Sequence, residues 1–237
     1  MTADGWTSAV RHQLGLGRLL PLGGPRDGAW ITEAAAEAVL RRAVRNVEGV
    51  RLGALRIAVA DPAGVYEPAV PPPPGALPPG PLRVTADIAA YSSEPLPTAA
   101  SRLRSALTAA ATERVGLVVS QVDLRVTALL DEDPEPEAVL AGPEPPPVGT
   151  AQHGDEARAT VAALSVPGVT RLTDVVGRAV RIEEREHVTA LPHRHARVEI
   201  AVSANHRALD VARKVRGVVS EALRDHPTVT VLITAVE

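Results

Sequence analysis

The chain has 237 residues, of which 45% are hydrophobic and 22% charged, and its formal net charge is −3. This is the composition of a globular protein with a substantial core and one or two domains. Aromatic residues make up only 2%, with no Phe, so the core must be aliphatic, and aromatic-lined pockets or base-stacking platforms are not expected. The net charge disfavours nucleic acid as a partner, and the lack of Cys excludes disulfides, thiolate metal sites and cysteine nucleophiles.

No targeting or membrane-spanning segment is predicted. Residues 1–10 do not combine a basic start with an apolar stretch, as a signal peptide would. No run approaches the roughly 18 apolar residues that a transmembrane helix needs. We therefore expect a cytoplasmic protein that associates with a membrane, if at all, through a partner.

Residues 1–27 precede the repeating pattern of the chain and form an N-terminal arm. Trp6, Val10 and Leu14 recur at helical spacing, and three arginines stand against one aspartate in residues 1–26. A short basic amphipathic segment can dock in a partner's groove or on a membrane surface, or it can fold back onto its own chain. These three residues are our candidate partner-binding site, for another protein or another copy of this one.

Residues 28–130 have the pattern of a small α/β module. Residues 29–31 resemble a short edge strand, and Thr32 is a suitable N-cap for the helix that follows, with Glu33 favourably placed in its first turn. Two strand-like runs come next, separated by a proline-rich loop at residues 68–81. A helix with one apolar stripe and a final alternating strand complete the module, and the stripe consists of Ala99, Leu103, Leu107 and Ala110.

Residues 131–150 are acidic and proline-rich and contain no basic residue, which predicts a stiff, extended linker between two domains. Proline-rich segments can also be bound by proteins that recognise polyproline, and a plain spacer is the alternative.

Residues 151–237 repeat the order helix, strand, strand, helix, strand. No counterpart of the opening strand at residues 29–31 precedes the first helix. The second helix again has an apolar stripe, made of Ala208, Ala212, Val215, Val219 and Ala222. We therefore predict an α+β fold of two tandem small modules, each a three- to four-stranded sheet with two helices packed on one face.

Several short motifs resemble the alkaline-shock family of general-stress proteins. Gly-Ala-Trp-Ile-Thr at residues 28–32 opens a helix, and Val-Glu-Gly-Val follows at residues 47–50. The second repeat has Val-Pro-Gly-Val at residues 166–169, and residues 208–215 resemble the start of the family's second helix. Three features depart from the family pattern, namely the duplication of the module, the long proline loop and the missing first strand of the second repeat.

The resemblance covers about residues 28–130 and 151–237, and it implies a non-enzymatic cytoplasmic protein of the cell-envelope stress response. Members of this family associate with the inner face of the membrane through an anchor protein and self-assemble, so the resemblance implies protein partners. It carries over no catalytic residues and no cofactor.

Candidate chemistry in the sequence is sparse. His193 and His195 could bind a metal together, but the alternation of side chains along the strand places them on the solvent face, opposite the core-facing Val198. A structural zinc site also needs four ligands, so we expect no metal there. The sequence contains no Gly-x-Ser-x-Gly elbow and no phosphate-binding loop. The carboxylates of residues 183–186 are interpreted as a solvated hairpin end.

We therefore expect no catalytic residue, no metal and no cofactor. The function that the sequence favours is an interaction or scaffold protein. The alternative is a regulatory module that binds a small ligand between its paired domains, which would require a polar pocket between them.

Overall fold

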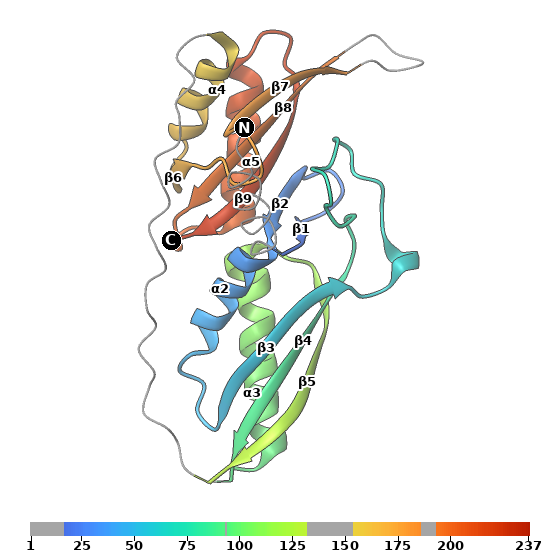
Figure 1. The fold of residues 1–237 in the computed structure, drawn as a ribbon, viewed down its shortest axis with the longest axis vertical. Coiled ribbons are helices and arrows are strands. Elements are labelled where there is room, and N and C mark those ends of the chain that lie inside the picture. The colour runs from blue at the N-terminus through green and yellow to red at the C-terminus, as the bar shows by residue number, and fades with distance from the viewer. Residues whose placement is uncertain (1–16, 93, 132–153, 186–192) are drawn as a thin grey trace, which may run out of the picture.

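The computed structural model describes residues 17–92, 94–131, 154–185 and 193–237, and it has the predicted α+β fold with two sheets (Figure 1). The first half contains β1 (Leu19–Leu22), β2 (Ala29–Thr32), α2 (Glu33–Val44), β3 (Val50–Val59), β4 (Leu82–Tyr91), α3 (Leu96–Ala109) and β5 (Val119–Leu130). A short helical turn, η1 (Pro62–Gly64), lies between β3 and β4, and a wider turn, η2 (Ala110–Val115), continues α3. The second half contains α4 (Gly154–Leu164), β6 (Val169–Leu172), β7 (Val180–Arg185), β8 (His193–Val202), α5 (Ala208–Ala222) and β9 (Thr228–Val236).

The first sheet has three strands in the order β3-β4-β5. β3 runs antiparallel to β4, and β4 runs parallel to β5. Helices α2 and α3 contact each other and pack on one face of this sheet. The α3 stripe predicted from the sequence is correct, because Ala99, Leu103, Leu107 and Ala110 are all buried.

The second sheet has six strands in the order β1-β2-β9-β8-β6, and β7 pairs with β8 alongside β6. β7 pairs with the first part of β8 and β6 with its last part, so together they fill one strand position. Helices α4 and α5 contact each other and cover one face. Val215 and Val219 of α5 are 0% exposed, as predicted, whereas Ala222 is exposed because the helix ends there.

The N-terminal strands differ most from expectation. Thr32 caps α2 as predicted, since its side chain accepts a hydrogen bond from the Ala35 N–H. However, β2 is not an edge strand of the first sheet. It lies between β1 and β9, antiparallel to the former and parallel to the latter, so the second sheet has six strands rather than three or four. β1 and β2 are buried along their whole length, and apolar strands of this kind need cover on both sides, which the second sheet supplies.

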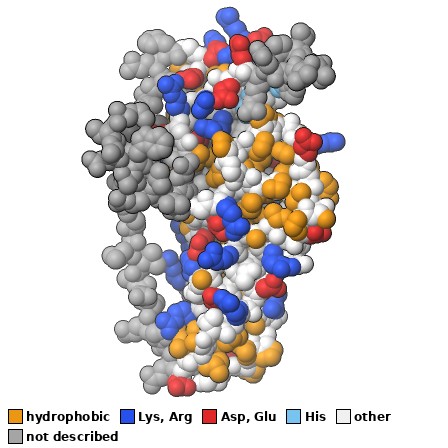
Figure 2. All heavy atoms as spheres, turned by 45° about the vertical axis from the view of Figure 1, so that its right-hand side comes forward, with side chains coloured by type: hydrophobic (Ala, Val, Ile, Leu, Met, Phe, Trp, Pro, Cys, Tyr) orange, Lys and Arg blue, Asp and Glu red, His pale blue; other side chains and the backbone are white. Residues whose placement is uncertain are grey.

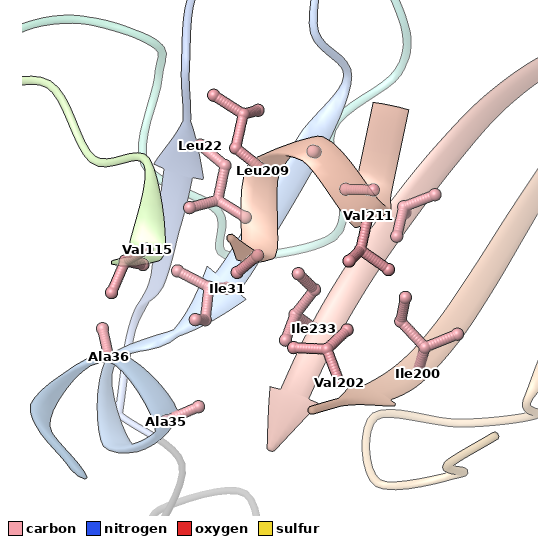
Figure 3. Close-up of a cluster of buried hydrophobic side chains, with 14 of the residues drawn as sticks. Leu22, Ile31, Ala35, Ala36, Val115, Ile200, Val202, Leu209, Val211 and Ile233 are labelled. Atoms are coloured by element: carbon pink, nitrogen blue, oxygen red, sulfur yellow. The ribbon is translucent and has the colours of Figure 1, made fainter. Parts of the chain in front are cut away.

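One hydrophobic core runs through both halves (Figure 3). Ile31 of β2, Val115 of η2, Leu209 of α5 and Ile233 of β9 point toward the same cluster. Gly116 approaches so closely that a Cβ atom there would lie 2.4 Å from the Cβ of Leu209. Only a residue without a side chain fits this contact between the halves.

The proline-rich loop lies between β3 and β4, as predicted, and it packs on the second sheet. The Leu77 carbonyl accepts a hydrogen bond from the Trp30 indole N–H (3.2 Å), and the Pro71 carbonyl accepts one from the Thr230 hydroxyl (2.9 Å). Val70 joins Leu19, Trp30 and Leu232 in a small second cluster on this side of the sheet. The loop therefore covers the face that the helices leave open.

Candidate functional site

The three-stranded sheet has helices on one face only, and the described residues leave the opposite face exposed. Side chains alternate along each strand, so every second residue of β3, β4 and β5 points to this open face. The exposed side chains there are mostly charged or polar: Arg51, Arg56, Arg83, Thr85, Gln121, Asp123 and Arg125.

Ion pairs tie the strands together across this open face. Arg125 of β5 makes two hydrogen bonds to Asp87 of β4, at 2.8 and 3.1 Å. The Arg83 guanidinium donates to Gln121 (2.6 Å) and lies 3.5 Å from the carboxylate of Asp123. The hydrogen bond from Arg125 lowers the pKa of Asp87, so this carboxylate stays charged under ordinary conditions. Exposed pairs of this kind stabilise a fold little, but they give the surface a defined charge pattern.

β5 and β3 are the two outermost strands of this sheet, and no described segment pairs with the far edge of β5. β5 is 12 residues long. It carries two large apolar side chains that are exposed, Val126 at 40% and Leu129 at 72% of their full exposure. The only described side chain that holds an edge carbonyl is Arg104 of α3, which donates to the Val122 carbonyl at 3.1 Å.

Figure 2 shows the same distribution in space. Hydrophobic side chains form one group at the lower end of the molecule, where β4 and β5 end in Figure 1, and a larger group at the right of the middle, and a band of acidic and basic side chains lies between the two. In the register with β4, Val126 and Leu129 lie opposite the buried Ile88 and Ala90, so they point to the helix-covered side of β5, whereas its charged side chains point to the open face.

The second sheet ends in β6 and β7 on one side and in β1 on the other, but the strand of this sheet that corresponds to β5 is covered at its edge. The edge of β9 that corresponds to the free edge of β5 is paired with β2. Its second face is covered by the proline loop and by the connection between β6 and β7, whose Val176 packs against Leu19, Trp30, Val70 and Leu232.

A buried charged pair lies under that connection. Glu199 of β8 is 0% exposed, and its Oε2 accepts a hydrogen bond from the Val176 N–H (3.0 Å). Its Oε1 lies 3.6 Å from the Arg197 guanidinium and has no hydrogen-bond partner among the described residues. The backbone of Glu199 bonds to Thr173 and Ala179, so the loop between β6 and β7 closes over it.

Burial raises the pKa of Glu199 to about 7, although the Val176 N–H and Arg197 each act to lower it and Asp174 adds to the rise. The charged form is disfavoured because the low-dielectric interior solvates it poorly. This carboxyl can therefore exchange a proton near neutral pH.

Neither the protein-family models nor the curated proteins contain a match to this chain. The resemblance to the alkaline-shock family rests on the short motifs quoted above and remains a hypothesis.

The predicted partner-binding residues Trp6, Val10 and Leu14 lie outside the described residues, so their role stays a prediction. Most of the predicted linker at residues 131–150 lies outside them as well. No described helix is long and apolar enough to cross a membrane.

The prediction for the histidines was wrong in one respect. His195 is only 5% exposed, and its Nδ1 lies 2.8 Å from the hydroxyl of Thr228. The face of β8 that we assigned to solvent is largely covered, because Arg197 and Glu199 on the same face are also shielded. Within the described ranges, no group of three or more acidic, His or Cys side chains is arranged to hold a metal ion.

Sequence reasoning missed both the β5 edge and the buried Glu199. The sequence did contain a signal for the burial of Glu199, because β8 ends in an unbroken apolar run, Ile200–Ala201–Val202. Such a run is typical of a strand that is buried on both faces. No comparable signal marks the free edge of β5, since it depends on which strand β2 joins.

Proposed function

We propose that this protein is a non-enzymatic interaction or scaffold protein whose docking surface is the three-stranded sheet. We define this docking surface as the free edge of β5 with its exposed Val126 and Leu129, together with the charged open face. The observation that carries the proposal is the contrast between the two sheets. The corresponding edge of β9 is closed by β2, whereas β5 is left open.

An open strand edge is a ready template for another strand, because its N–H and C=O groups lack partners. Proteins therefore cover, shorten or charge such edges, unless the edge serves for binding. β5 is long rather than short, and its last part is apolar. Addition of a partner strand to a sheet edge is a common mode of recognition, in which the backbone supplies affinity and the side chains supply specificity.

The resemblance of residues 28–130 and 151–237 to alkaline-shock proteins extends this proposal. It suggests a cytoplasmic role in the cell-envelope stress response, with a membrane-anchor protein as one partner. The charged open face would then be the part of the docking surface that this partner contacts.

Site-specific crosslinking in cells tests the docking surface. A photoreactive residue at Leu129, which is 72% exposed, should capture a protein partner. The matched control is Val161 of α4, which is 69% exposed and lies far from β5 in the fold. Equal capture at both positions, or capture at Val161 alone, would show that β5 is not the docking surface.

A further inference from the structure

We propose that the occupant of the β5 edge is the β5 strand of a second copy of this chain, paired antiparallel about a two-fold axis at Leu124. The inference rests on the proposed docking surface and specifies what binds there. It would join two three-stranded sheets into one continuous sheet.

The charge pattern of β5 supports this occupant. Around Leu124 the strand reads nearly the same in both directions, with Val122 and Val126 two residues away and the opposite charges Asp123 and Arg125 one residue away. In an antiparallel pair centred on Leu124, Asp123 of each copy faces Arg125 of the other. Opposite charges placed directly across a strand pair are favourable, and like charges are not.

Neighbouring registers lack this complementarity. A pair centred on Asp123 would place two aspartates opposite each other, and a pair centred on Arg125 would do the same with two arginines. A register shifted by an odd number of residues would bring the polar face of one strand beside the helix-covered face of the other. The pairing centred on Leu124 is therefore the register that the charges select.

The geometry of β5 suits this pairing. Its regular stretch, between the two register shifts with β4, covers residues 121–126 and so contains all five central positions. A two-fold axis perpendicular to the sheet keeps the helices of both copies on one side and the charged faces on the other. Val126, now 40% exposed, would be covered by Val122 of the second copy.

Arg104 is the one described side chain that the second strand must displace. It is exposed and holds only the Val122 carbonyl of this edge, so pairing exchanges one side-chain hydrogen bond for a ladder of backbone bonds. We therefore expect Arg104→Ala to tighten the association.

Charge reversal of the full chain tests the register. Sedimentation over a wide range of protein concentration should show a reversible dimer for the native chain. Asp123→Arg and Arg125→Asp each place like charges opposite at both ends of the pair, and each should weaken self-association roughly tenfold or more. An equimolar mixture of the two variants should form a heterodimer, because every facing pair is then complementary.

The mixture separates an interface effect from a folding effect. Each substitution also removes an ion pair within the chain, to Arg83 or Asp87, and such a defect would not be cured by mixing. A native chain that stays monomeric, or variants that dimerise as well as it does, would overturn the inference. If Leu129 nevertheless crosslinks to a different protein, the docking surface stands and only its occupant is wrong.

Discussion

Glu199 has a strongly perturbed acid–base equilibrium, and the cause is its position. It lies on β8 beneath the connection between β6 and β7, where no part of its side chain is exposed. Arg197 compensates it incompletely, since the Arg197 Nε and the Glu199 Oε1 both lack a hydrogen-bond partner in the described part of the chain. A buried ion pair of this kind contributes little to stability, because the loss of hydration opposes the attraction.

The stability of the fold should therefore depend on pH through Glu199. In the unfolded chain the carboxyl titrates near 4.5, and in the folded chain at about 7. Between these values the folded state keeps a proton that the unfolded state has released, so the free energy of unfolding falls as pH rises through this window. A difference of this size corresponds to about 3 kcal/mol. That stability is fully present below the lower value and lost above the higher one.

Glu199→Gln removes the titration but keeps an acceptor for the Val176 N–H. Urea unfolding should show the variant more stable than the native chain by up to about 3 kcal/mol at about pH 8, and similar to it at about pH 5. Glu184→Gln, at an exposed position of β7, is the control and should leave the pH profile unchanged. A native profile that is flat between the two values would show that Glu199 does not titrate as its burial requires.

At the scale of single elements, two glycines with opposite surroundings test the packing of α5. Gly217 lies within α5 and would meet nothing within 4 Å if it carried a Cβ. Gly116 has a φ of +96° and faces Leu209. Ala favours a helix over Gly, whereas a side chain at positive φ and in close contact is strained.

Gly217→Ala should therefore raise the free energy of unfolding by about 1 kcal/mol, and Gly116→Ala should lower it by about 1–3 kcal/mol. Urea denaturation of the two variants, side by side with the native chain, measures both. The two substitutions add the same methyl group, so each is the control for the other. A loss of stability at Gly217, or none at Gly116, would contradict the packing described for these elements.

The local elements could be predicted from the sequence because their signals are local. The apolar stripes of α3 and α5, the Thr32 cap and the proline loop all follow from periodicity or from the chemistry of one residue. The partner of β2 could not be predicted in this way. Its four residues carry no local signal for a particular partner, and the pairing depends on contacts with residues about 200 positions away.

The pairing of β2 also determines the surroundings of the candidate site. Because β2 joins β9, the edge of β9 is paired, and no described strand pairs with the corresponding edge of β5. The burial of Glu199 likewise depends on the connection between β6 and β7, which covers its side chain. The alternation of residues along a strand does not predict the path of such a connection. Only the polar alternation of Asp123 and Arg125 on one face of β5 was readable in advance, as part of an alternating strand.

At the scale of the whole molecule, the two halves are interlocked. The chain enters through β1 and β2 in the second sheet and then builds the first sheet, before it returns to complete the second. Asp27 pairs with Arg213 at 2.8 and 3.1 Å, and the guanidinium of Arg216 donates to the carbonyls of Arg26 and Asp27. Residues near the N-terminus therefore hold the second half together.

This arrangement and the linker predicted at residues 131–150 lead to different expectations when the chain is cut there. Two independent modules would separate. Interlocked halves should remain one complex, because β2 stays paired with β9 and its Ile31 stays in the common core. A specific protease site inserted within residues 131–150 allows this cut to be made in the folded protein. Size-exclusion chromatography and thermal melting of the cut protein then measure association and cooperativity.

We expect the two fragments to elute together and to melt in one transition. Ile31→Ala, at a position that is 0% exposed, should weaken their association, since truncating a buried Ile costs about 2–5 kcal/mol and leaves a cavity between β2 and the second sheet. Val161→Ala, on the exposed side of α4, should leave it unchanged. Fragments that separate after cleavage, each melting as it does when expressed alone, would show instead that the pairing of β2 with β9 adds too little free energy to join the halves, and that residues 131–150 divide two modules that fold independently.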